Sequence, residues 1–435
     1  MMQRFSKTIQ IENISEFKIQ LLQWSQQYET TLWLDSNSYY QKHSSFDAVM
    51  ALGVNSMIET IYNQAFKKLK EYQTNVNDYI FGYLGYDLKN DVENLESNNF
   101  DGLNFPDLFF FQPKKIFKIK GNTLEVKYLL KHKNEIDKDL EQIKSIQKNY
   151  SETPSTENIK IKLRIHKDEY YNKIESILNH IHKGDIYEAN FCQEFYSENS
   201  RINPVEVYKS LNEISKPPFA TFLKFSDKYL LSASPERYIK KEENQVISQP
   251  IKGTQKRALT NKEDEILIKD LEQNPKERAE NIMIVDLVRN DLSRFAKKGS
   301  VKVDELCKVY TFEQVHQLIS TISCRVDNTI HPVDIIKNTF PMGSMTGAPK
   351  ISAMKIIEEL EESKRGLYSG AVGYFTPKGN FDFNVIIRSI LYNASKKYVS
   401  YSVGGAITAQ SIPEKEYEEC LLKAKAMKQV LLNTK

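Results

Sequence analysis

Short runs of aromatic and β-branched residues recur along the whole chain and are separated by stretches of helical periodicity. Such runs are typical of β-strands. They fall at 31–34, 79–86, 189–196, 219–225, 229–233, 369–375, 382–391 and 398–403. We see no internal repeat, and the mixture of strand-like runs with separate helices favours an α+β fold.

Four helices are indicated by start and stop signals in the sequence. They are a helix from 167 that ends at Gly184, a helix opened by 274–275 that runs through Arg294, a helix that follows 346–349 and closes near Gly366, and a last helix with a capping box formed by Ser411 and Glu414. The first ends at a glycine stop, and the second starts with an Asn cap and a Pro in the first turn. The spacing of Ser411 and Glu414 is that of a capping box.

The chain is predicted to contain two regions, residues 1–150 and residues 165–432. Residues 131–160 separate them and are mostly charged and polar. This stretch is expected to begin as a lysine-rich helix and to end as a linker around 151–155.

Composition excludes several classes of protein. The 435 residues carry a net charge of only +3, which leaves no electrostatic footprint for nucleic acid. No apolar run approaches the roughly 20 residues needed to cross a bilayer, and the N-terminus lacks the pattern of a signal peptide. The four cysteines are widely spaced and predict reduced thiols rather than disulfides or a zinc site. We expect a cytoplasmic protein without a membrane anchor.

Two of the expected helices carry paired carboxylates. Glu277 and Glu280 are three residues apart on one helix, and Glu416 and Glu419 are three apart on the last helix. Residues at this spacing share a helix face, so each pair can point two carboxylates at one place. Four oxygen donors suit Mg²⁺, although each pair alone is more typical of a solvated face than of a metal site. Lys423 continues the second face, where it can bind a substrate carboxylate or pair with Glu419.

Lys252 lies in the run Gln-Pro-Ile-Lys-Gly-Thr at 249–254. Pro250 restricts the backbone on one side, and Gly253 permits a tight turn or a close approach to a ligand. Taken alone, the run is compatible with a solvated lysine at a strand end as well as with a buried amine nucleophile. Arg388 lies in an apolar strand-like run, where its charge requires a partner, and a buried carboxylate would serve.

Two further residues are weaker candidates. His316 precedes an apolar run and is more typical of a structural histidine than of a catalytic one. Thr346 lies in Thr-Gly-Ala-Pro at the start of an expected helix, whose free N–H groups can bind an anion or can be ordinarily capped.

Taken together, the motifs resemble those of the chorismate-utilising enzymes, and within that family the subfamily that aminates chorismate at C4. The resemblance covers 165–430, and the run Gly-Tyr-Leu-Gly-Tyr at 82–86 also fits this subfamily. It rests on Ser-Pro-Glu-Arg at 234–237, Pro-Ile-Lys-Gly-Thr at 250–254, Lys-Glu-Arg-Ala-Glu at 276–280, Val-Asp-Leu-Val-Arg-Asn-Asp-Leu at 285–292, Thr-Gly-Ala-Pro-Lys at 346–350, Arg-Gly-Leu-Tyr-Ser-Gly at 365–370 and Glu-Tyr-Glu-Glu at 416–419.

The resemblance implies a fold and a set of roles. The fold is two large packed antiparallel β-sheets, a sandwich with helices on the outside. Mg²⁺ would hold the ring carboxylate of chorismate through the two glutamate pairs. Lys252 would add at C2 as the C4 hydroxyl leaves, Glu236 would protonate that hydroxyl, and ammonia would then enter at C4. The residues that match or are candidates for substrate contacts are Arg388, Tyr368, Lys423, Gly404, Gly405, His316, Thr254 and Thr346.

The nucleophilic role requires a neutral amine. A free lysine, with a pKa of about 10.4, is neutral only to about 0.04% at pH 7. Burial or a nearby cation must therefore favour the neutral form, and an ionised Glu236 would oppose it. We expect Glu236 to be protonated when substrate is bound.

Several positions depart from common patterns of the family. Asn281 replaces a usual histidine, Ala406 a common glycine, and Ser344 a common threonine. Glu188 stands where relatives that add water at C2 carry a lysine base, which argues against an isochorismate or salicylate synthase. The runner-up is an anthranilate-forming large subunit, although relatives of that kind usually have a small residue where Lys252 stands.

The nitrogen source is expected to lie outside the chain. No Gly-x-Cys-x-Gly elbow of a glutamine amidotransferase is present, so we expect a separate glutaminase subunit or free ammonia. We expect no lyase fused after the last helix. A different class of function, a non-catalytic relative that holds tryptophan or chorismate, is disfavoured because Lys252, Glu236 and both glutamate pairs are intact.

Overall fold

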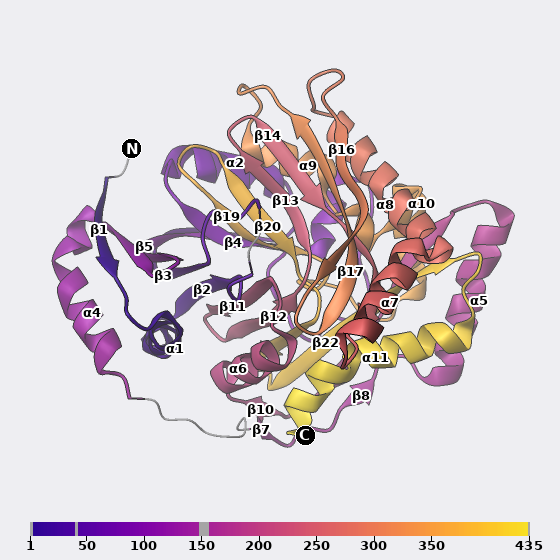
Figure 1. Ribbon diagram of the computed structural model, residues 1–435, viewed down its shortest axis with the longest axis horizontal. Helices are drawn as coiled ribbons and strands as arrows, with labels where there is room; N and C mark the ends of the chain where they lie inside the picture. The colour runs from indigo at the N-terminus through magenta and orange to yellow at the C-terminus, as the bar shows by residue number, and fades with distance from the viewer. Residues whose placement is uncertain (1–2, 40–41, 148–155, 434–435) are drawn as a thin grey trace.

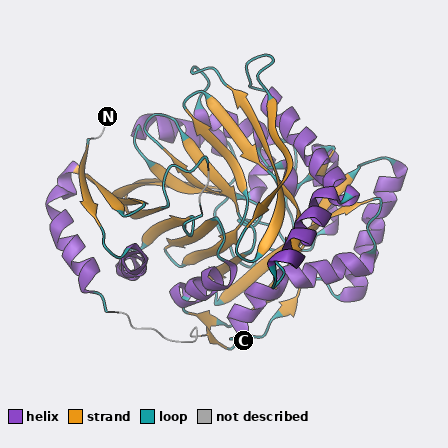
Figure 2. Cartoon of the chain, viewed as in Figure 1, coloured by secondary structure: helices purple, strands orange, loops and turns teal. Residues whose placement is uncertain are grey.

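The computed structural model describes residues 3–39, 42–147 and 156–433. Two large antiparallel sheets form its centre, and helices cover their outer faces (Figures 1 and 2). The linker expected at 151–155 lies outside the described residues. Among the described residues, no helix has the length and apolar character needed to cross a membrane.

The first sheet contains strands from the whole length of the chain, and all its pairings are antiparallel. In spatial order the strands are β1 (Arg4–Gln10), β6 (Thr123–Leu129), β5 (Leu108–Lys120), β3 (Ala48–Thr60), β2 (Thr30–Asp35), β11 (Phe219–Phe225), β12 (Lys228–Ser234), β21 (Ser389–Asn393), β22 (Tyr398–Thr408) and β9 (Glu188–Ser197), with β8 (Lys162–Leu163) and β18 (Gly347–Ala348) along the far side of β9.

The second sheet starts from the other ends of β3 and β5. In spatial order its further strands are β4 (Ile80–Leu84), β19 (Ala371–Phe375), β20 (Phe381–Val385), β13 (Arg237–Glu242), β14 (Gln245–Gln249), β17 (Val315–Arg325) and β16 (Lys302–Thr311), with β15 (Ile251–Lys256) following β14 along the same side of β17. A separate two-stranded pair joins β7 (Thr156–Glu157) to β10 (Arg201–Ile202).

A bulge lets β3 and β5 belong to both sheets. Their register shifts between Val54 and Ser56, opposite Pro113. Phe111 and Phe117 are six residues apart and would share a face in a regular strand. Here Phe111 packs between the sheets, and Phe117 packs under the outer helices. The bulge thus exchanges the two faces of the strand and redirects it from one sheet to the other.

A cluster of apolar side chains from both sheets fills the space between them, as expected for a sandwich. It includes Leu32 and Leu34 of β2, Phe81 and Tyr83 of β4, Leu223 of β11 and Val372 of β19. The expected fold of two packed antiparallel sheets is confirmed.

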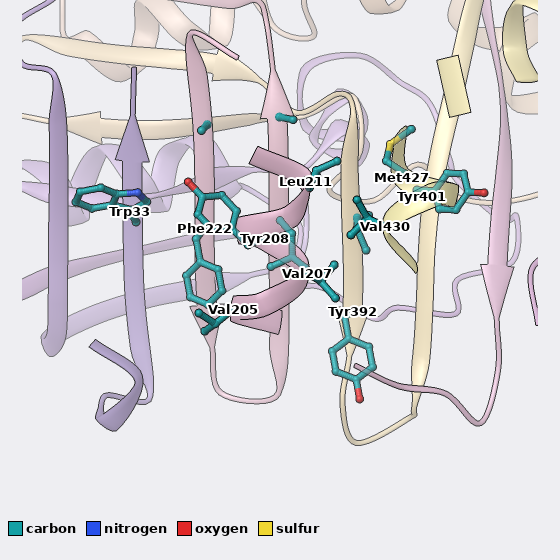
Figure 3. Close-up of a cluster of buried hydrophobic side chains, with 14 of the residues drawn as sticks. Trp33, Val205, Val207, Tyr208, Leu211, Phe222, Tyr392, Tyr401, Met427 and Val430 are labelled. Atoms are coloured by element: carbon teal, nitrogen blue, oxygen red, sulfur yellow. The ribbon is translucent and has the colours of Figure 1, made fainter. Parts of the chain in front are cut away.

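Helices bury their apolar faces on the outside of each sheet. Those on the first sheet are α1 (Ile14–Trp24), α4 (Ile136–Ser145), α5 (Lys167–Lys183), α6 (Pro204–Ser215), α10 (Lys350–Leu360) and α11 (Pro413–Leu432), and those on the second are α2 (Ala65–Val76), α8 (Pro275–Ser293) and α9 (Pro332–Thr339). Figure 3 shows part of the first set, where Tyr208 of α6 and Met427 of α11 share one cluster with Phe222 and Tyr401 of the sheet.

Two of the predicted helix ends are confirmed and two are wrong. Gly184 ends α5 with φ +85°, and the Asn274 side chain accepts from the N–H groups of the first turn of α8. The helix expected to close near Gly366 ends at Leu360. The capping box expected at Ser411 does not form, because the Ser411 hydroxyl accepts from the N–H of Thr408 instead and closes the turn before α11.

The strand predicted at 382–391 is wrong as a single element. It is split into β20 and β21 by residues 386–388, and the two parts belong to different sheets. In the region 131–160, a 3₁₀ helix at Leu130–Glu135 precedes α4. Strands from 1–150 pair with strands from 165–432 in both sheets, through β2–β11 and β4–β19. The predicted division into two regions itself remains a prediction.

Candidate functional site

The candidate site lies where the chain passes between the sheets. Glu236 stands between β12 of the first sheet and β13 of the second, and Arg388 stands between β20 and β21. The helices that carry the glutamate pairs, α8 and α11, lie on the same side of the molecule, at the right in Figure 1. Glu236 and Arg388, which are far apart in the sequence, therefore both lie on segments that connect one sheet to the other.

A bulge in β15 sets Lys252 apart from its strand. The register with β17 shifts between Ile251 and Thr254, so Lys252 and Gly253 stand outside the ladder. Gly253 has φ +88°, and a Cβ there would lie 3.0 Å from Oε2 of Glu277. Only glycine fits this backbone and this close approach. The side chain of Lys252, 13% exposed, reaches Oε1 of Glu188 at 3.1 Å.

The surroundings of Lys252 favour its charged form. Burial lowers the pKa of the amine, but Glu188 and Glu280 outweigh burial and raise the pKa above its usual value. The resting lysine is therefore an ammonium ion held by carboxylates. Nucleophilic attack requires the neutral amine instead, so the ammonium ion must lose a proton before it can react.

Glu236 is buried at 3% exposure and bonded to one hydroxyl. Ser344 donates to its Oε1 at 2.7 Å. Burial raises the pKa of Glu236 to about 7, although Ser344 and Lys252 act to lower it. A carboxyl with this pKa is about half protonated near pH 7, so a large share of the molecules hold the proton that a general acid needs.

The pair on α8 is placed by the helix start. The Asn274 cap fixes the first turn, from which Glu277 and then Glu280 project. Burial raises the pKa of Glu277, and the charge of Glu419 on α11 adds to that effect. Burial also raises the pKa of Glu280, to about 7, against the opposing charge of Lys252. The two helices thus bring their carboxylates within electrostatic reach of each other.

The pair on α11 faces β22. Burial raises the pKa of Glu416, whereas for Glu419 the ammonium of Lys423 at 2.6 Å outweighs burial and lowers the pKa. Lys423 also donates to the carbonyl of Gly404 at 3.1 Å, and Gly405 lies beside Glu416 and Lys423. A Cβ at Gly404 would clash with the sulfur of Cys192, so the strand approaches its neighbour closely there.

These glutamates fit Mg²⁺ by their chemistry. They are oxygen donors, three of the four have raised pKa values, and a divalent cation would relieve their mutual repulsion. Within 3–39, 42–147 and 156–433, no three Asp, Glu, His or Cys side chains form a ready-made metal cage. Mg²⁺ does not need one, because it binds through one or two carboxylates and takes water and substrate oxygens as its other ligands.

Arg388 does not have the carboxylate partner that the sequence suggested. Its guanidinium donates to the backbone carbonyl of Lys423 at 3.2 Å, and no described carboxylate lies within ion-pair distance. Its backbone has φ +52°, a left-handed conformation that is uncommon outside glycine and often marks functional sites. Burial lowers its pKa. A guanidinium with unused donors is suited to a ligand carboxylate.

The remaining predicted contacts differ in what they can offer a ligand. Tyr368 is buried, and its hydroxyl faces the Cys192 sulfur at 3.9 Å. Thr254 is exposed on β15, whereas the hydroxyl of Thr346 is buried and donates to backbone carbonyls. His316 is fully buried, and its two ring nitrogens contact Asp264 and Thr311, so neither is free for a ligand.

Comparison with known proteins identifies the family. The profile described as chorismate binding enzyme matches residues 25–429. The chain belongs to this family. Among its relatives is aminodeoxychorismate synthase component 1 of Bacillus subtilis (strain 168), which is 32% identical over 363 residues. The match covers 80% of this chain and 76% of that protein.

Two further chorismate binding enzymes illustrate the range of matches. A probable chloroplastic aminodeoxychorismate synthase of Oryza sativa subsp. japonica is 41% identical over 61% of this chain, but the match spans only 30% of that longer protein. The crystal structure of anthranilate synthase component I from Streptococcus pneumoniae TIGR4 superposes with a TM-score of 0.78 at 26% identity and covers 90% of this chain and 95% of that one.

Sequence reasoning missed three residues that support the site. In the sequence Glu188 is distinguished only by standing in place of a lysine, whereas in the structure it is the ion-pair partner of Lys252. Asn281 is buried, and its amide donates to the carbonyls of Lys252 at 3.4 Å and Leu318 at 3.2 Å. It therefore holds the bulged segment. Arg365 belongs to a sequence motif whose pattern does not indicate its buried contacts. The signal for Asn281 that the sequence offers is a polar residue directly after a glutamate pair.

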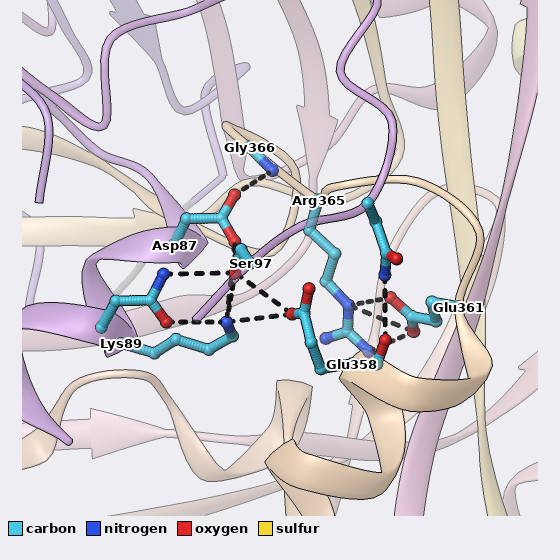
Figure 4. Close-up of polar contacts among 9 residues, drawn as sticks. Asp87, Lys89, Ser97, Glu358, Glu361, Arg365 and Gly366 are labelled. Atoms are coloured by element: carbon cyan, nitrogen blue, oxygen red, sulfur yellow. Dashed lines mark hydrogen bonds and ion pairs between the residues drawn. The ribbon is translucent and has the colours of Figure 1, made fainter. Parts of the chain in front are cut away.

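Arg365 belongs to a buried polar network that braces the site (Figure 4). It forms an ion pair with Glu361 at 2.6 Å, and it donates to the carbonyls of Met345 and Asn190, both at 2.6 Å. Met345 follows Ser344, the donor to Glu236, and Asn190 lies two residues after Glu188. Beside this pair, the fully buried Lys89 contacts Glu358 at 3.0 Å.

Proposed function

We propose that this protein is the large subunit of an aminodeoxychorismate synthase. It aminates chorismate at C4 with ammonia in an Mg²⁺-dependent reaction and gives 4-amino-4-deoxychorismate, the precursor of p-aminobenzoate in folate synthesis. The observation that carries the proposal is the buried Lys252 at one site with Glu236, a carboxyl with a pKa of about 7. Relatives named aminodeoxychorismate synthase, at 32 to 41% identity, support it.

The roles follow the chemistry of each side chain. Glu277, Glu280, Glu416 and Glu419 would hold Mg²⁺, which when bound neutralises the ring carboxylate and fixes its position. Arg388 and Lys423 bind carboxylates of chorismate, because both are cations and the Arg388 guanidinium lies against α11 at the carbonyl of Lys423. Tyr368, Thr254, Thr346 and the backbone at Gly404 and Gly405 shape the pocket around the substrate. We assign no substrate contact to His316.

The chain's own residues carry the bond changes. The Lys252 amine adds at C2 while the C4–O bond breaks, and Glu236 gives its proton to the departing hydroxyl, which leaves as water. Ammonia then bonds to C4, and the lysine leaves C2 with its electron pair. The product ammonium returns a proton to Glu236.

The nitrogen is proposed to come from a glutaminase partner. The Bacillus subtilis relative is named component 1, a name that implies a second component of that protein. We place the reaction in the cytoplasm, since all four cysteines are free and buried thiols.

Anthranilate formation is the second candidate, favoured by the likeness to the Streptococcus pneumoniae structure. Product analysis separates the two functions. The purified chain, given chorismate, ammonium and Mg²⁺, is expected to form an aminated product that retains the enolpyruvyl group, without fluorescent anthranilate or pyruvate. Anthranilate with an equal amount of pyruvate would overturn the proposal. Mass spectrometry with ¹⁵N-ammonium identifies the product.

The proton on Glu236 predicts a decline in activity at alkaline pH. Because its pKa of about 7 is above the usual range, the acid form is present below that pH and is lost as pH rises through it. Ser344→Ala removes a hydrogen bond that favours the ionised form, so the decline in kcat/KM, which reports groups of the free enzyme, should move to higher pH. Ser344→Thr keeps a hydroxyl and serves as the control. A Ser344→Ala profile identical to that of wild type would contradict the assignment.

A further inference from the structure

Glu188 is buried in an unusual state. It is 1% exposed, and its Oε1 accepts from Lys252 at 3.1 Å. Its Oε2 is also buried, yet no group of the described residues donates to it. The backbone here is held on both sides, because Glu188 pairs with Ala348 of β18 and with Thr408 of β22. The carboxylate thus starts from a rigid base.

A buried carboxylate oxygen that accepts no hydrogen bond lowers the stability of the folded protein by about 1–3 kcal/mol. Two other buried glutamates of this protein avoid that cost. Glu361 uses both oxygens for Arg365, and Glu194 on the same strand as Glu188 accepts from Arg164 and Tyr398. Glu188 therefore differs from the glutamates whose role is to complete a buried ion pair.

Lys252 needs an acceptor for its proton. Five carboxylates act on its ammonium, namely Glu188, Glu280, Glu236, Glu277 and Glu419. Of these, Glu188 is within hydrogen-bond distance of Nζ of Lys252. No other group of the described residues accepts a hydrogen bond from this Nζ. Proton transfer requires this geometry. Glu236 is unsuited to the task, because it must keep its own proton for the leaving hydroxyl.

We propose that Glu188 is the catalytic proton acceptor that converts Lys252 to a free amine. This inference rests on the proposed function. One proton passes from Nζ to the Glu188 carboxylate, and the freed electron pair forms the bond to C2. When ammonia has bonded to C4 and the C2–N bond has broken, the neutral amine takes the same proton back from Glu188. The enzyme ends in its starting state, and no further reactant is needed.

The test is Glu188→Gln, which keeps the shape and a hydrogen-bond acceptor but cannot take a proton. We expect kcat to fall by about 10²–10⁴-fold with little change in the KM for chorismate. The pH optimum should then move upward relative to wild type, because hydroxide must remove the lysine proton while Glu236 still has to keep its own. The control is Glu194→Gln, a buried paired glutamate on the same strand, and its kcat should stay within about twofold of wild type. Thermal unfolding checks that each variant is folded.

Glu188→Asp provides a second variant if the glutamine variant folds poorly. A shortened carboxylate can reach Lys252 through one water, so it should retain about tenfold more activity than the glutamine variant. Acylation of Lys252 by an amine-directed ester, followed by peptide mass spectrometry, gives a readout without turnover. Loss of the Glu188 charge lowers the lysine pKa, so Lys252 of Glu188→Gln should label faster than that of wild type.

The outcomes distinguish failure of this inference from failure of the proposed function, the amination of chorismate at C4. If Lys252→Ala loses C4 amination while Glu188→Gln keeps the wild-type kcat, the inference is overturned and the proposed function stands. Equal activity of the Asp and Gln variants would also overturn it, as would unchanged labelling of Lys252. If Lys252→Ala keeps C4 amination, the proposed function itself fails.

Discussion

Lys252→Ala is expected to lower the rate of C4 amination by at least about 10³-fold, because the variant lacks the nucleophile that opens the C2 position. Any residual product should arise from direct attack of ammonia, with a gain of C2-aminated product or anthranilate. Chromatography of the reaction with ¹⁵N-ammonium measures both routes. Unchanged C4 amination would refute the role of the lysine.

This substitution also leaves Glu188 buried without its partner, so stability must be separated from chemistry. Lys252→Arg is the matched control. It keeps the positive charge beside Glu188 but offers a guanidinium, which remains protonated and cannot act as the nucleophile. The arginine variant should therefore unfold at nearly the wild-type temperature and still lack C4 amination. An arginine variant with wild-type turnover would show that only the charge matters.

Arg365→Met is expected to lower the free energy of unfolding by about 3–5 kcal/mol, since it leaves Glu361 charged and buried at 5% exposure. The carbonyls of Met345 and Asn190 lose their donor as well. Urea denaturation followed by circular dichroism measures the change. The expected loss is among the largest that a single substitution in this chain can cause.

A double variant identifies the cause of that loss. Arg365→Met with Glu361→Leu removes both charges, so it should recover about 2 kcal/mol or more relative to Arg365→Met alone. On the surface, Arg289 and Asp286 lie 2.7 Å apart with their side chains 54% and 63% exposed. Arg289→Met should cost less than about 1 kcal/mol. A double variant no more stable than the single one would mean that lost packing, not the unpaired charge, is responsible.

Local signals in the sequence predicted much of the fold and which helices carry the candidate glutamates. The Asn-Pro start of α8 placed Glu277 and Glu280 correctly, because a helix cap acts within its own turn. The strand runs at β2, β9 and β11 were recognised from composition for the same reason. The pattern of Ser411 and Glu414 failed because the serine bonds backward to Thr408, a choice that depends on the path of the preceding strand.

Long-range contacts could not be predicted from the sequence. Lys252 meets Glu188 across 64 positions of chain, and nothing local to either residue indicates the other. The left-handed backbone of Arg388 arises because the chain changes sheets there, which a periodicity pattern reads as one continuous strand. The exchange of faces in β5 at Pro113 is of the same kind. Each depends on tertiary structure that forms only when both sheets are complete.

The pairing of β4 with β19, and of β2 with β11, has a consequence for biosynthesis. At translation rates of about 5–20 residues per second, β2 and β4 leave the ribosome on the order of ten seconds or more before their later partners β11 and β19. During that interval β2 and β4 present open edges with apolar faces, which are templates for aggregation. The nascent protein is therefore a natural client for chaperones that shield exposed strands, and its yield on expression should depend on their supply.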